Sequence, residues 1–313
     1  MREMSVKVLV CDPLDAEGVE RLRQEDFVVD VKSSIEPAEL ERVVAGYDAL
    51  VVRSRTKVTK QVLEKGRRLK VVGRVGAGVD NIDSEAAEKL GIAVLNTPEA
   101  PSDSVAELTV GLMLAIARRI PLADRSMKDG KWSKKELEGT LLNGKTLGLI
   151  GLGHIGAKVA QVAKAFGMKI LVFKRTPPSR ETLDLLGAEF VSLGELLRRS
   201  DVVSIHVPLT DQTVGMIGEK ELNAMKEGTV LVNTSRGGIV DEDALLKALK
   251  SGRLGGAGFD VYCTEPCGNL ELVGLPNVVC TPHIGAQTGE AQKAASVLLS
   301  EKLVQFFREP KNK

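Results

Sequence analysis

The chain of 313 residues has a balanced charge, with 43 Lys and Arg against 42 Asp and Glu and a formal net charge of +1. This balance gives no support to a nucleic-acid partner or to a membrane-surface partner. Hydrophobic residues make up 43% and charged residues 27%, which excludes wholesale disorder. A chain of this length suits about two globular domains.

The cysteines and the apolar stretches indicate the compartment. The four cysteines are Cys11, Cys263, Cys267 and Cys280. They are too few and too irregularly spaced for a disulfide scaffold, and they fit a reducing cytoplasm. The start of the chain lacks the pattern of a signal peptide, and the apolar stretch Val105–Ile116 contains Glu107 and is too short to cross a bilayer. We therefore expect a cytoplasmic protein with no membrane partner.

In the first third of the chain, short apolar runs alternate with amphipathic segments. The predicted strands are Val6–Cys11, Val28–Val31, Ala49–Val52, Val71–Val75 and Ala93–Leu95. The predicted helices include Asp15–Gln24, Pro37–Val44 and Ser84–Leu90. Strands that alternate with helices indicate βαβ units and a parallel sheet.

A long helix is predicted next. Ser104 and Glu107 have the spacing of a capping box, so we expect Ser104 near the N-terminus of this helix. The apolar pattern continues to Ile116, and Pro121 is expected to end or kink the helix.

A second series of strands follows. The predicted strands are Thr146–Ile150, Lys169–Phe173, Val202–His206, Val230–Asn233, Ala257–Val261 and Val278–Thr281. Helical patterns separate most of them, which indicates a second α/β unit. The tail, Ala286–Phe307, has a helical pattern that could cover either unit.

Residues 151–156 form a Gly-x-Gly-x-x-Gly motif, with His154 and Ile155 at two of its variable positions. The motif follows a predicted strand and opens a helical pattern, which is the setting of a dinucleotide-binding turn. Gly151 allows the tight turn, Gly153 lets a pyrophosphate approach the backbone, and Gly156 lets helix and strand pack closely. The N–H groups at the helix start would meet the anion. The structural alternative is a glycine-rich loop without a ligand.

The end of the next predicted strand should carry the residue that selects the ribose of the dinucleotide. The sequence there is Lys174–Arg175–Thr176, with two cations and no carboxylate. Such cations would attract a 2′-phosphate and could not accept hydrogen bonds from ribose hydroxyls. This modestly favours NADP over NAD, and the alternative is a pair of solvated basic residues beside bound NAD.

Three residues suited to redox chemistry follow predicted strands of the second unit. His283 and Glu265 provide an imidazole and a carboxylate, and Arg236 provides a guanidinium. Ligands of open parallel sheets bind at this edge. A carboxylate fixes the tautomer of an imidazole, and a guanidinium can clamp a carboxylate or polarise a carbonyl. Together they form a minimal set for reducing a 2-oxo acid.

Each of these residues also has a structural alternative. His283 could be an ordinary strand-end residue, Glu265 could shape a turn beside a proline, and Arg236 could be a surface cation. Cys263 and Cys267 are spaced as C-x-x-x-C, but no second Cys or His pair lies nearby. We therefore expect bystander thiols and no metal.

With these residues in view, the sequence resembles the D-isomer-specific 2-hydroxyacid dehydrogenases over nearly its whole length. Within them it most resembles the D-3-phosphoglycerate dehydrogenases. The stretches that carry the resemblance are Val52–Thr59, Gly73–Asp83, Asn96–Thr109, Leu142–Gly156, Asn233–Leu249, Phe259–Pro266 and Thr281–Gln292.

The resemblance implies two doubly wound parallel-sheet domains. A flavodoxin-like substrate domain would comprise residues 1–98 and 286–313, with a Rossmann cofactor domain, residues 99–285, inserted into it. The family is usually homodimeric through the helix region near residues 102–120. The chain stops soon after its last helix, so we do not expect a serine-sensing domain of the kind that long phosphoglycerate dehydrogenases carry.

The resemblance also implies the site residues. Arg236, Glu265 and His283 would be catalytic, with His283 as the acid–base. The loop formed by Val75, Gly76, Ala77 and Gly78 would cradle the substrate carboxylate. The residues expected to line the cofactor site beyond the glycine turn are His206, Val207, Pro208, Thr234, Ser235, Asp260 and Gly285.

Arginines near the ends of two predicted strands favour a phosphorylated substrate. Arg53 and Arg55 flank Ser54, and Arg74 lies at the end of another strand. We expect Arg53, Ser54 and Arg74 to bind the substrate. Cations there suit a dianionic phosphate. Solvated surface arginines are the alternative, more so for Arg55 than for Arg53 or Arg74.

Lys174 departs from the Asp expected in phosphoglycerate dehydrogenases and resembles NADP-using reductases. Three functions are therefore compatible with the sequence. The first is an NAD(P)-dependent D-3-phosphoglycerate dehydrogenase of serine synthesis. The second is an NADPH-linked glyoxylate or hydroxypyruvate reductase. The third, from another class, is an NAD(H)-sensing, corepressor-like binding protein.

Overall fold

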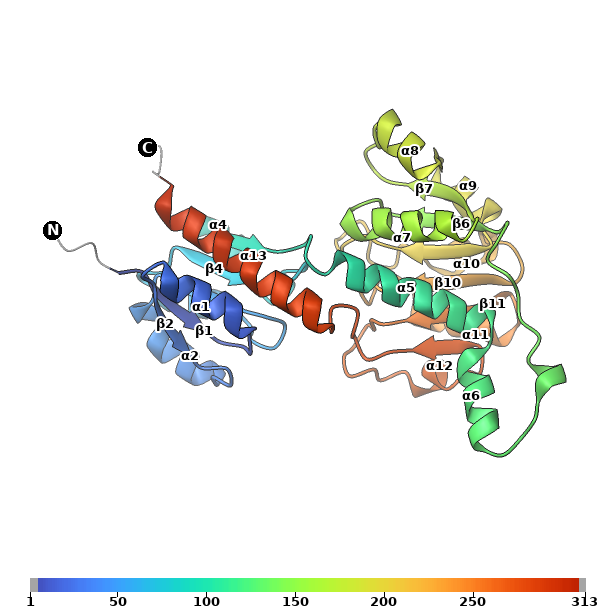
Figure 1. Ribbon diagram of the computed structural model, residues 1–313, viewed down its shortest axis with the longest axis horizontal. Coiled ribbons are helices and arrows are strands. Elements are labelled where there is room, and N and C mark those ends of the chain that lie inside the picture. Colours follow the sequence, from blue (N-terminus) through green and yellow to red (C-terminus); the bar gives the residue numbers. More distant parts are fainter. Residues whose placement is uncertain (1–4, 310–313) are drawn as a thin grey trace. The chain divides into compact units, whose positions relative to one another are not determined.

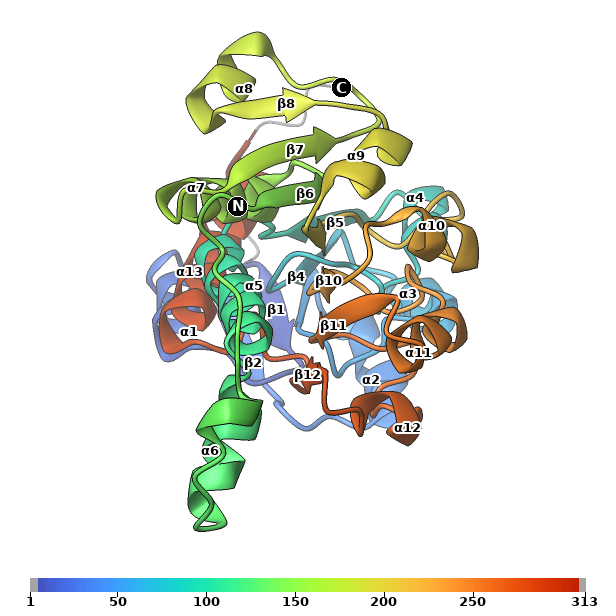
Figure 2. The ribbon, with the colours of Figure 1, turned by 90° about the vertical axis from the view of Figure 1, so that its right-hand side faces the viewer.

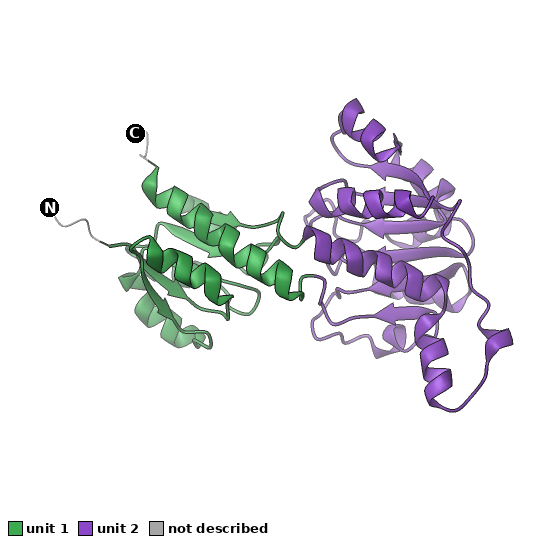
Figure 3. Cartoon of the chain, viewed as in Figure 1, with its two compact units in different colours: residues 1–101, 286–313 green, residues 102–285 purple. Residues whose placement is uncertain are grey.

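The computed structural model describes residues 5–309 and divides into two compact units (Figure 3). Unit 1 comprises residues 1–101 and 286–313, and unit 2 comprises residues 102–285. The division falls after residue 101, where the sequence interpretation placed it after residue 98. Residues 1–4 and 310–313 of the predicted outer domain lie outside the described residues.

Unit 1 contains a parallel five-stranded sheet. Its strands are β1 Lys7–Val10, β2 Val28–Val31, β3 Ala49–Val52, β4 Val71–Arg74 and β5 Ala93–Asn96. Their order, β2-β1-β3-β4-β5, is the flavodoxin-like order. Side chains alternate between its faces: Val8 and Val10 enter one core cluster, while Leu9 and Cys11 enter another. Apolar residues on both faces produce the continuous apolar runs seen in the sequence.

Helices cover both faces of this sheet (Figure 1). They are α1 Ala16–Gln24, α2 Pro37–Val43, α3 Lys60–Lys65, α4 Ser84–Lys89 and α13 Gly289–Arg308, with a 3₁₀ turn η1 at Val44–Gly46. The tail helix α13 packs beside α1, where Ser300 Oγ donates to the carbonyl oxygen of Gly18 at 2.7 Å. A β-carbon on Gly18 would lie 2.8 Å from Ser296, so this close packing requires glycine. The tail therefore covers unit 1.

Unit 2 contains a parallel seven-stranded sheet. Its strands are β6 Thr146–Ile150, β7 Lys169–Phe173, β8 Ala188–Phe190, β9 Val202–Ile205, β10 Thr229–Asn233, β11 Leu254–Phe259 and β12 Val278–Cys280. Their order is β12-β11-β10-β9-β6-β7-β8. All of them are parallel, and from β6 the chain adds strands first on one side, to β8, and then on the other side, beginning with β9. This is the Rossmann order extended by one strand. Both sheets confirm the predicted fold class.

The helices of unit 2 lie on both faces of its sheet. They are α5 Ser102–Ala117, α6 Ile120–Lys128, α7 His154–Ala165, α8 Arg180–Leu186, α9 Leu193–Arg199, α10 Glu219–Ala224, α11 Glu242–Lys250 and α12 Leu270–Val273, with a 3₁₀ turn η2 at Lys134–Glu136. Figure 2 shows α5 and α7 on one face and α9, α10 and α11 on the other. Within residues 5–309, no helix is long and apolar enough to span a membrane.

The start of α5 differs from its prediction. The helix begins at Ser102, so Ser104 lies inside its first turn and does not cap it. Ser104 Oγ instead donates to the carbonyl oxygen of Gly285 at 2.6 Å. The Ser104 hydroxyl therefore bonds to a residue distant in the sequence, whereas its spacing from Glu107 had predicted that it would cap the helix. Beyond α5, Arg119 has a φ of 52° and breaks the helix, and Pro121 lies in the first turn of the separate helix α6.

Candidate functional site

The glycine turn of unit 2 joins β6 to α7, beside the point where the strand order reverses. Gly151 has a φ of 101°, and a β-carbon there would overlap the carbonyl oxygen of His206, which directly follows the neighbouring strand β9. A β-carbon on Gly156 would lie 2.5 Å from the carbonyl oxygen of Gly151. These two positions need glycine because backbone meets backbone there.

Gly153 differs from its two neighbours, because a β-carbon on it would meet nothing within 4 Å. It is the N-cap of α7, and no side chain caps that helix. The first N–H groups of a helix have no partner within it and attract anions. The protein's own packing therefore does not require glycine at this position, whereas a pyrophosphate close to the backbone would. This observation fits the predicted dinucleotide. His154 is exposed and Ile155 half-buried in the first turn.

The predicted coenzyme selector follows β7. Lys174, Arg175 and Thr176 are all exposed at the end of that strand. Arg175 Nη1 donates to Gln212 Oε1 at 3.1 Å, which ties the selector segment to the loop after β9. The site thus presents two cations and no carboxylate where a ribose is expected.

His206 begins the loop that continues through Val207 and Pro208. Its Nε2 lies 2.9 Å from Ser204 Oγ, while its buried Nδ1 has no hydrogen-bond partner. Burial lowers the pKa of His206 to about 4. The imidazole is therefore neutral at pH 7, and its ring is bonded to Ser204.

The free energy of unfolding should depend on pH because the His206 imidazole is neutral in the folded protein. An unfolded His has a pKa near 6.5, so between about pH 6.5 and 4 the unfolded chain takes up a proton that the folded chain excludes. Stability is therefore lost as pH falls, by about 2 to 3 kcal/mol at pH 4.5. In His206→Gln the difference in unfolding free energy between pH 7 and 4.5 should shrink by this amount. Urea denaturation at both pH values measures it, and an unchanged difference would contradict the assignment.

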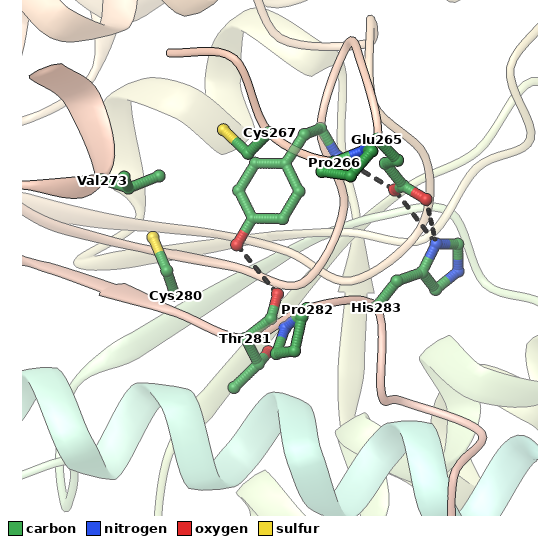
Figure 4. A pocket seen from close by; sticks show the side chains of 9 residues that line it. Glu265, Pro266, Cys267, Val273, Cys280, Thr281, Pro282 and His283 are labelled. Atoms are coloured by element: carbon green, nitrogen blue, oxygen red, sulfur yellow. Dashed lines mark hydrogen bonds and ion pairs between the residues drawn. The ribbon is translucent and has the colours of Figure 1, made fainter. Parts of the chain in front are cut away.

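His283 and Glu265 form the pair expected of an acid–base site (Figure 4). Nδ1 of His283 lies 2.8 Å and 3.0 Å from the two carboxylate oxygens of Glu265. Nδ1 therefore carries the proton of the neutral ring, and Nε2 is left to exchange protons. The His283 side chain is 48% exposed, so a substrate can reach it. A hydrogen bond thus joins His283 to Glu265, eighteen positions away in the sequence.

Asp260 holds the loop that carries His283. Its buried carboxylate accepts from Thr281 Oγ1 at 2.6 Å and from the backbone N–H groups of Ile284 and Gly285 at 2.8 Å each. His283 itself has a φ of 53°, a left-handed conformation that is uncommon for a residue with a side chain. The bonds on both sides of His283 fix this conformation. Asp260 was predicted only as a cofactor contact, and its role in organising this loop was missed.

The loop after β10 carries Arg236. Asn233, which is 1% exposed, accepts from the N–H and hydroxyl of Ser235 and donates from Nδ2 to the carbonyl oxygen of Arg236 at 2.8 Å. A β-carbon on Gly237 would overlap the carbonyl oxygen of Tyr262, so this loop lies against the loop of Glu265. Thr234 is anchored by a 2.7 Å hydrogen bond between its hydroxyl and that of Thr109. Asn233 begins one of the stretches that carry the family resemblance, but its role in bracing this loop was not predicted.

A cavity of about 500 Å³ opens beside the His283–Glu265 pair (Figure 4). It is lined by Tyr262, Glu265, Pro266, Cys267, Val273, Cys280, Thr281, Pro282 and His283. Burial raises the pKa of Tyr262 and of Cys280, so both stay protonated at neutral pH. Burial also raises the pKa of Cys263 to about 11. Among residues 5–309, no group of three or more His, Cys, Asp or Glu residues could hold a metal ion.

The loop after β3 in unit 1 carries two arginines with different surroundings. Arg55 Nε lies 3.1 Å from Asp12 Oδ1, and its Nη2 donates to the carbonyl oxygens of Cys11 and Ser33. The Arg55 side chain is 49% exposed, but its charge is paired with that of Asp12. Arg53 has no such ion pair within the described residues, and Ser54 between them is exposed.

The loop at Val75–Gly78 follows β4. Thr97 accepts from the N–H of Gly76 through its hydroxyl at 2.8 Å and donates from its own N–H to Gly76 O. Within residues 5–309 the N–H groups of Ala77 and Gly78 donate to no protein acceptor. The Arg74 guanidinium folds against Gly76, since a β-carbon there would overlap it. The loop therefore offers backbone donors and a cation together.

The two folds, the glycine turn and the His–Glu pair are features expected of dinucleotide-dependent dehydrogenases. The family model described as "D-isomer specific 2-hydroxyacid dehydrogenase, NAD binding domain" matches residues 110–285. The chain belongs to this family of D-isomer specific 2-hydroxyacid dehydrogenases.

Relatives carry three activity names. The chain is 48% identical over 97% of its length to a D-3-phosphoglycerate dehydrogenase of Methanocaldococcus jannaschii, of which it spans only 58%. It is 47% identical over 95% of its length to a hydroxypyruvate reductase of Thermotoga maritima, of which it spans 97%. A glyoxylate reductase structure from Paecilomyes thermophila matches with a TM-score of 0.91 and 34% identity, covering 97% of this chain and 96% of that one.

Proposed function

We propose that the protein transfers a hydride between a nicotinamide dinucleotide and a D-2-hydroxy acid. The observation that carries this proposal is the His283–Glu265 pair, with Nδ1 engaged at 2.8 Å and Nε2 available, on the sheet that also bears the glycine turn. A proton-transferring imidazole and a dinucleotide turn on one sheet are what such a reaction needs.

The residues of unit 2 divide the work. When bound, the dinucleotide would be held at Gly151–Gly156 and would supply or accept the hydride. In the oxidation direction His283 Nε2 takes the proton of the substrate hydroxyl, and in reduction it returns that proton. Glu265 accepts from Nδ1 and stabilises the imidazolium. Arg236 donates to the substrate carboxylate and the C2 oxygen.

For the substrate we propose D-3-phosphoglycerate, oxidised to 3-phosphohydroxypyruvate for serine synthesis in the cytoplasm. Arg53, which has no carboxylate partner, and Arg74 support a dianionic phosphate. The backbone N–H groups of Ala77 and Gly78 would donate hydrogen bonds to the substrate carboxylate. Relatives named D-3-phosphoglycerate dehydrogenase agree with this choice.

Arg53→Ala tests the phosphate role. Losing a charge-assisted contact should raise KM for 3-phosphohydroxypyruvate about 10- to 100-fold and leave KM for hydroxypyruvate within about twofold. Steady-state assays with both acids measure the two KM values. Lys57→Ala, which removes an exposed cation farther along the same loop, is the matched control and should leave both KM values unchanged. An equal rise of both KM values would exclude a phosphate role for Arg53.

The second candidate function is an NADPH-linked glyoxylate or hydroxypyruvate reductase. Two exposed cations at Lys174 and Arg175 favour it, as do the names of two relatives. Under either function we propose that these cations bind the 2′-phosphate of NADP. We further propose a homodimer that pairs near residues 102–120, supported by the exposed apolar side chains of Ile120 at the end of this region and of Met127 in the helix that follows.

Lys174→Asp tests the coenzyme choice. A carboxylate would accept hydrogen bonds from ribose hydroxyls and repel a 2′-phosphate, so the ratio of kcat/KM for NADPH to that for NADH should fall about tenfold or more. Lys169→Asp, an exposed lysine at the other end of β7, is the control. If Lys174→Asp leaves the ratio unchanged, Lys174 does not select the coenzyme.

A further inference from the structure

Arg53 is held by a glutamine of the tail helix. Its Nη1 donates to Gln292 Oε1 at 3.2 Å and to the carbonyl oxygen of Pro13 at 3.4 Å. Gln292 lies in the first turns of α13, and its Nε2 donates to Gln287 Oε1 at 2.9 Å. The second bond fixes which end of the Gln292 amide faces Arg53, because the amide must turn its oxygen toward the guanidinium.

The backbone of the same loop is fixed independently. Asp12, which is 1% exposed, accepts from the N–H of Arg53 at 2.6 Å and from the Thr56 hydroxyl at 2.8 Å. Asn81 Nδ2 donates to the carbonyl oxygens of Arg53 and Thr56 at 2.8 Å and 2.7 Å. With the backbone held in this way, the remaining freedom of Arg53 lies in its long side chain. Within residues 5–309, Gln292 is its one side-chain partner.

The chemistry of these partners separates the two arginines of the loop. Arg55 faces the carboxylate of Asp12, which neutralises its charge. Arg53 faces an amide, which orients the guanidinium through a hydrogen bond and leaves its full charge available. An oriented and uncompensated guanidinium is suited to bind a dianion, because the cost of ordering the side chain has already been met.

We propose that Gln292 is a positioning residue that determines specificity for a phosphorylated acid by holding Arg53 without neutralising it. This inference rests on the proposed function of Arg53 as the phosphate-binding residue. It assigns Gln292 no contact with the substrate. Gln292 acts only on the orientation and the charge of Arg53.

Two substitutions separate positioning from a merely structural role. Gln292→Ala removes the contact, so KM for 3-phosphohydroxypyruvate should rise about five- to tenfold, the scale of one hydrogen bond, with kcat within about twofold. Gln292→Glu restores the contact but pairs Arg53 with a carboxylate, so KM for the phosphorylated acid should rise at least as much. KM for hydroxypyruvate should stay within about twofold in both variants.

The controls use the same helix and the same arginine. Gln305→Ala, which removes an exposed glutamine bonded to Glu309 farther along α13, should leave every KM unchanged. In the Arg53→Ala background, Gln292→Ala should have no further effect, because the residue through which it acts is gone. Thermal unfolding by circular dichroism checks that each variant is folded.

The outcomes distinguish this inference from the function on which it rests. If the wild type shows no preference for the phosphorylated acid, the proposed substrate is wrong and the inference falls with it. If Arg53→Ala removes the preference while Gln292→Ala and Gln292→Glu retain it, the proposed function stands and the role of Gln292 is wrong. A wild-type KM in Gln292→Glu would likewise overturn the charge argument.

Discussion

Replacing His283 with glutamine is expected to lower kcat by about 10²- to 10⁴-fold, the usual contribution of a general acid–base. Glutamine is polar and of similar size, so the bonds of Asp260 to Thr281, Ile284 and Gly285 should keep the loop in place. The variant lacks a group that can exchange a proton at Nε2. Steady-state reduction of the 2-oxo acid measures kcat, and fluorescence titration measures dinucleotide binding, which should stay within about twofold.

Glu265→Gln provides the graded control for this prediction. It keeps a hydrogen-bond partner for Nδ1 but removes the negative charge that stabilises the imidazolium, so kcat should fall less than in His283→Gln. A loss of less than about tenfold in His283→Gln would show that another group exchanges the proton. An equal loss in a variant that no longer binds the dinucleotide would point to damage of the fold.

The second large effect is expected at the glycine turn, where two glycines should respond differently. A β-carbon on Gly153 meets nothing within 4 Å, so Gly153→Ala should leave the melting temperature nearly unchanged. It would nevertheless occupy the space that a pyrophosphate needs, and the Kd for the dinucleotide should rise on the order of tenfold or more. Calorimetric titration and thermal unfolding measure the two quantities separately.

Gly156→Ala is the matched variant. It lies inside α7, where alanine normally stabilises a helix by up to about 1 kcal/mol. Here its β-carbon would lie 2.5 Å from the carbonyl oxygen of Gly151, so the protein should lose about 1 to 3 kcal/mol of stability and also bind the dinucleotide less tightly. If Gly153→Ala destabilised the protein as much as Gly156→Ala, the difference in packing around the two residues would be wrong.

Local patterns predicted those elements whose residues are buried on both faces. The strands Ala49–Val52, Thr146–Ile150 and Lys169–Phe173 have the bounds expected from their apolar runs. The strand Ala188–Phe190 was missed because it is short, lies at the edge of its sheet and contains an exposed Glu189. The helix α3 at Lys60–Lys65 was not among the helices named from the sequence, since fewer than two turns give little periodicity to detect.

Within the candidate site, too, some features could be predicted from local sequence and others could not. The glycine turn has a local signature, so spacing alone indicated it. The pairing of His283 with Glu265 joins different loops, and family resemblance indicated it more than spacing did. The bracing contacts of Asp260 and Gln292 depend on tertiary folding, and Gln292 lies 239 positions from Arg53 along the chain. No pattern within one segment could reveal them.

The proposed function is that of a dehydrogenase that prefers a phosphorylated 2-oxo acid. The most direct test compares kcat/KM for 3-phosphohydroxypyruvate, hydroxypyruvate and glyoxylate, each with NADH and with NADPH. We expect the phosphorylated acid to be preferred by about tenfold or more, the value of one good contact to its phosphate. A higher kcat/KM for glyoxylate or hydroxypyruvate would contradict it and would identify the protein as a reductase of those acids.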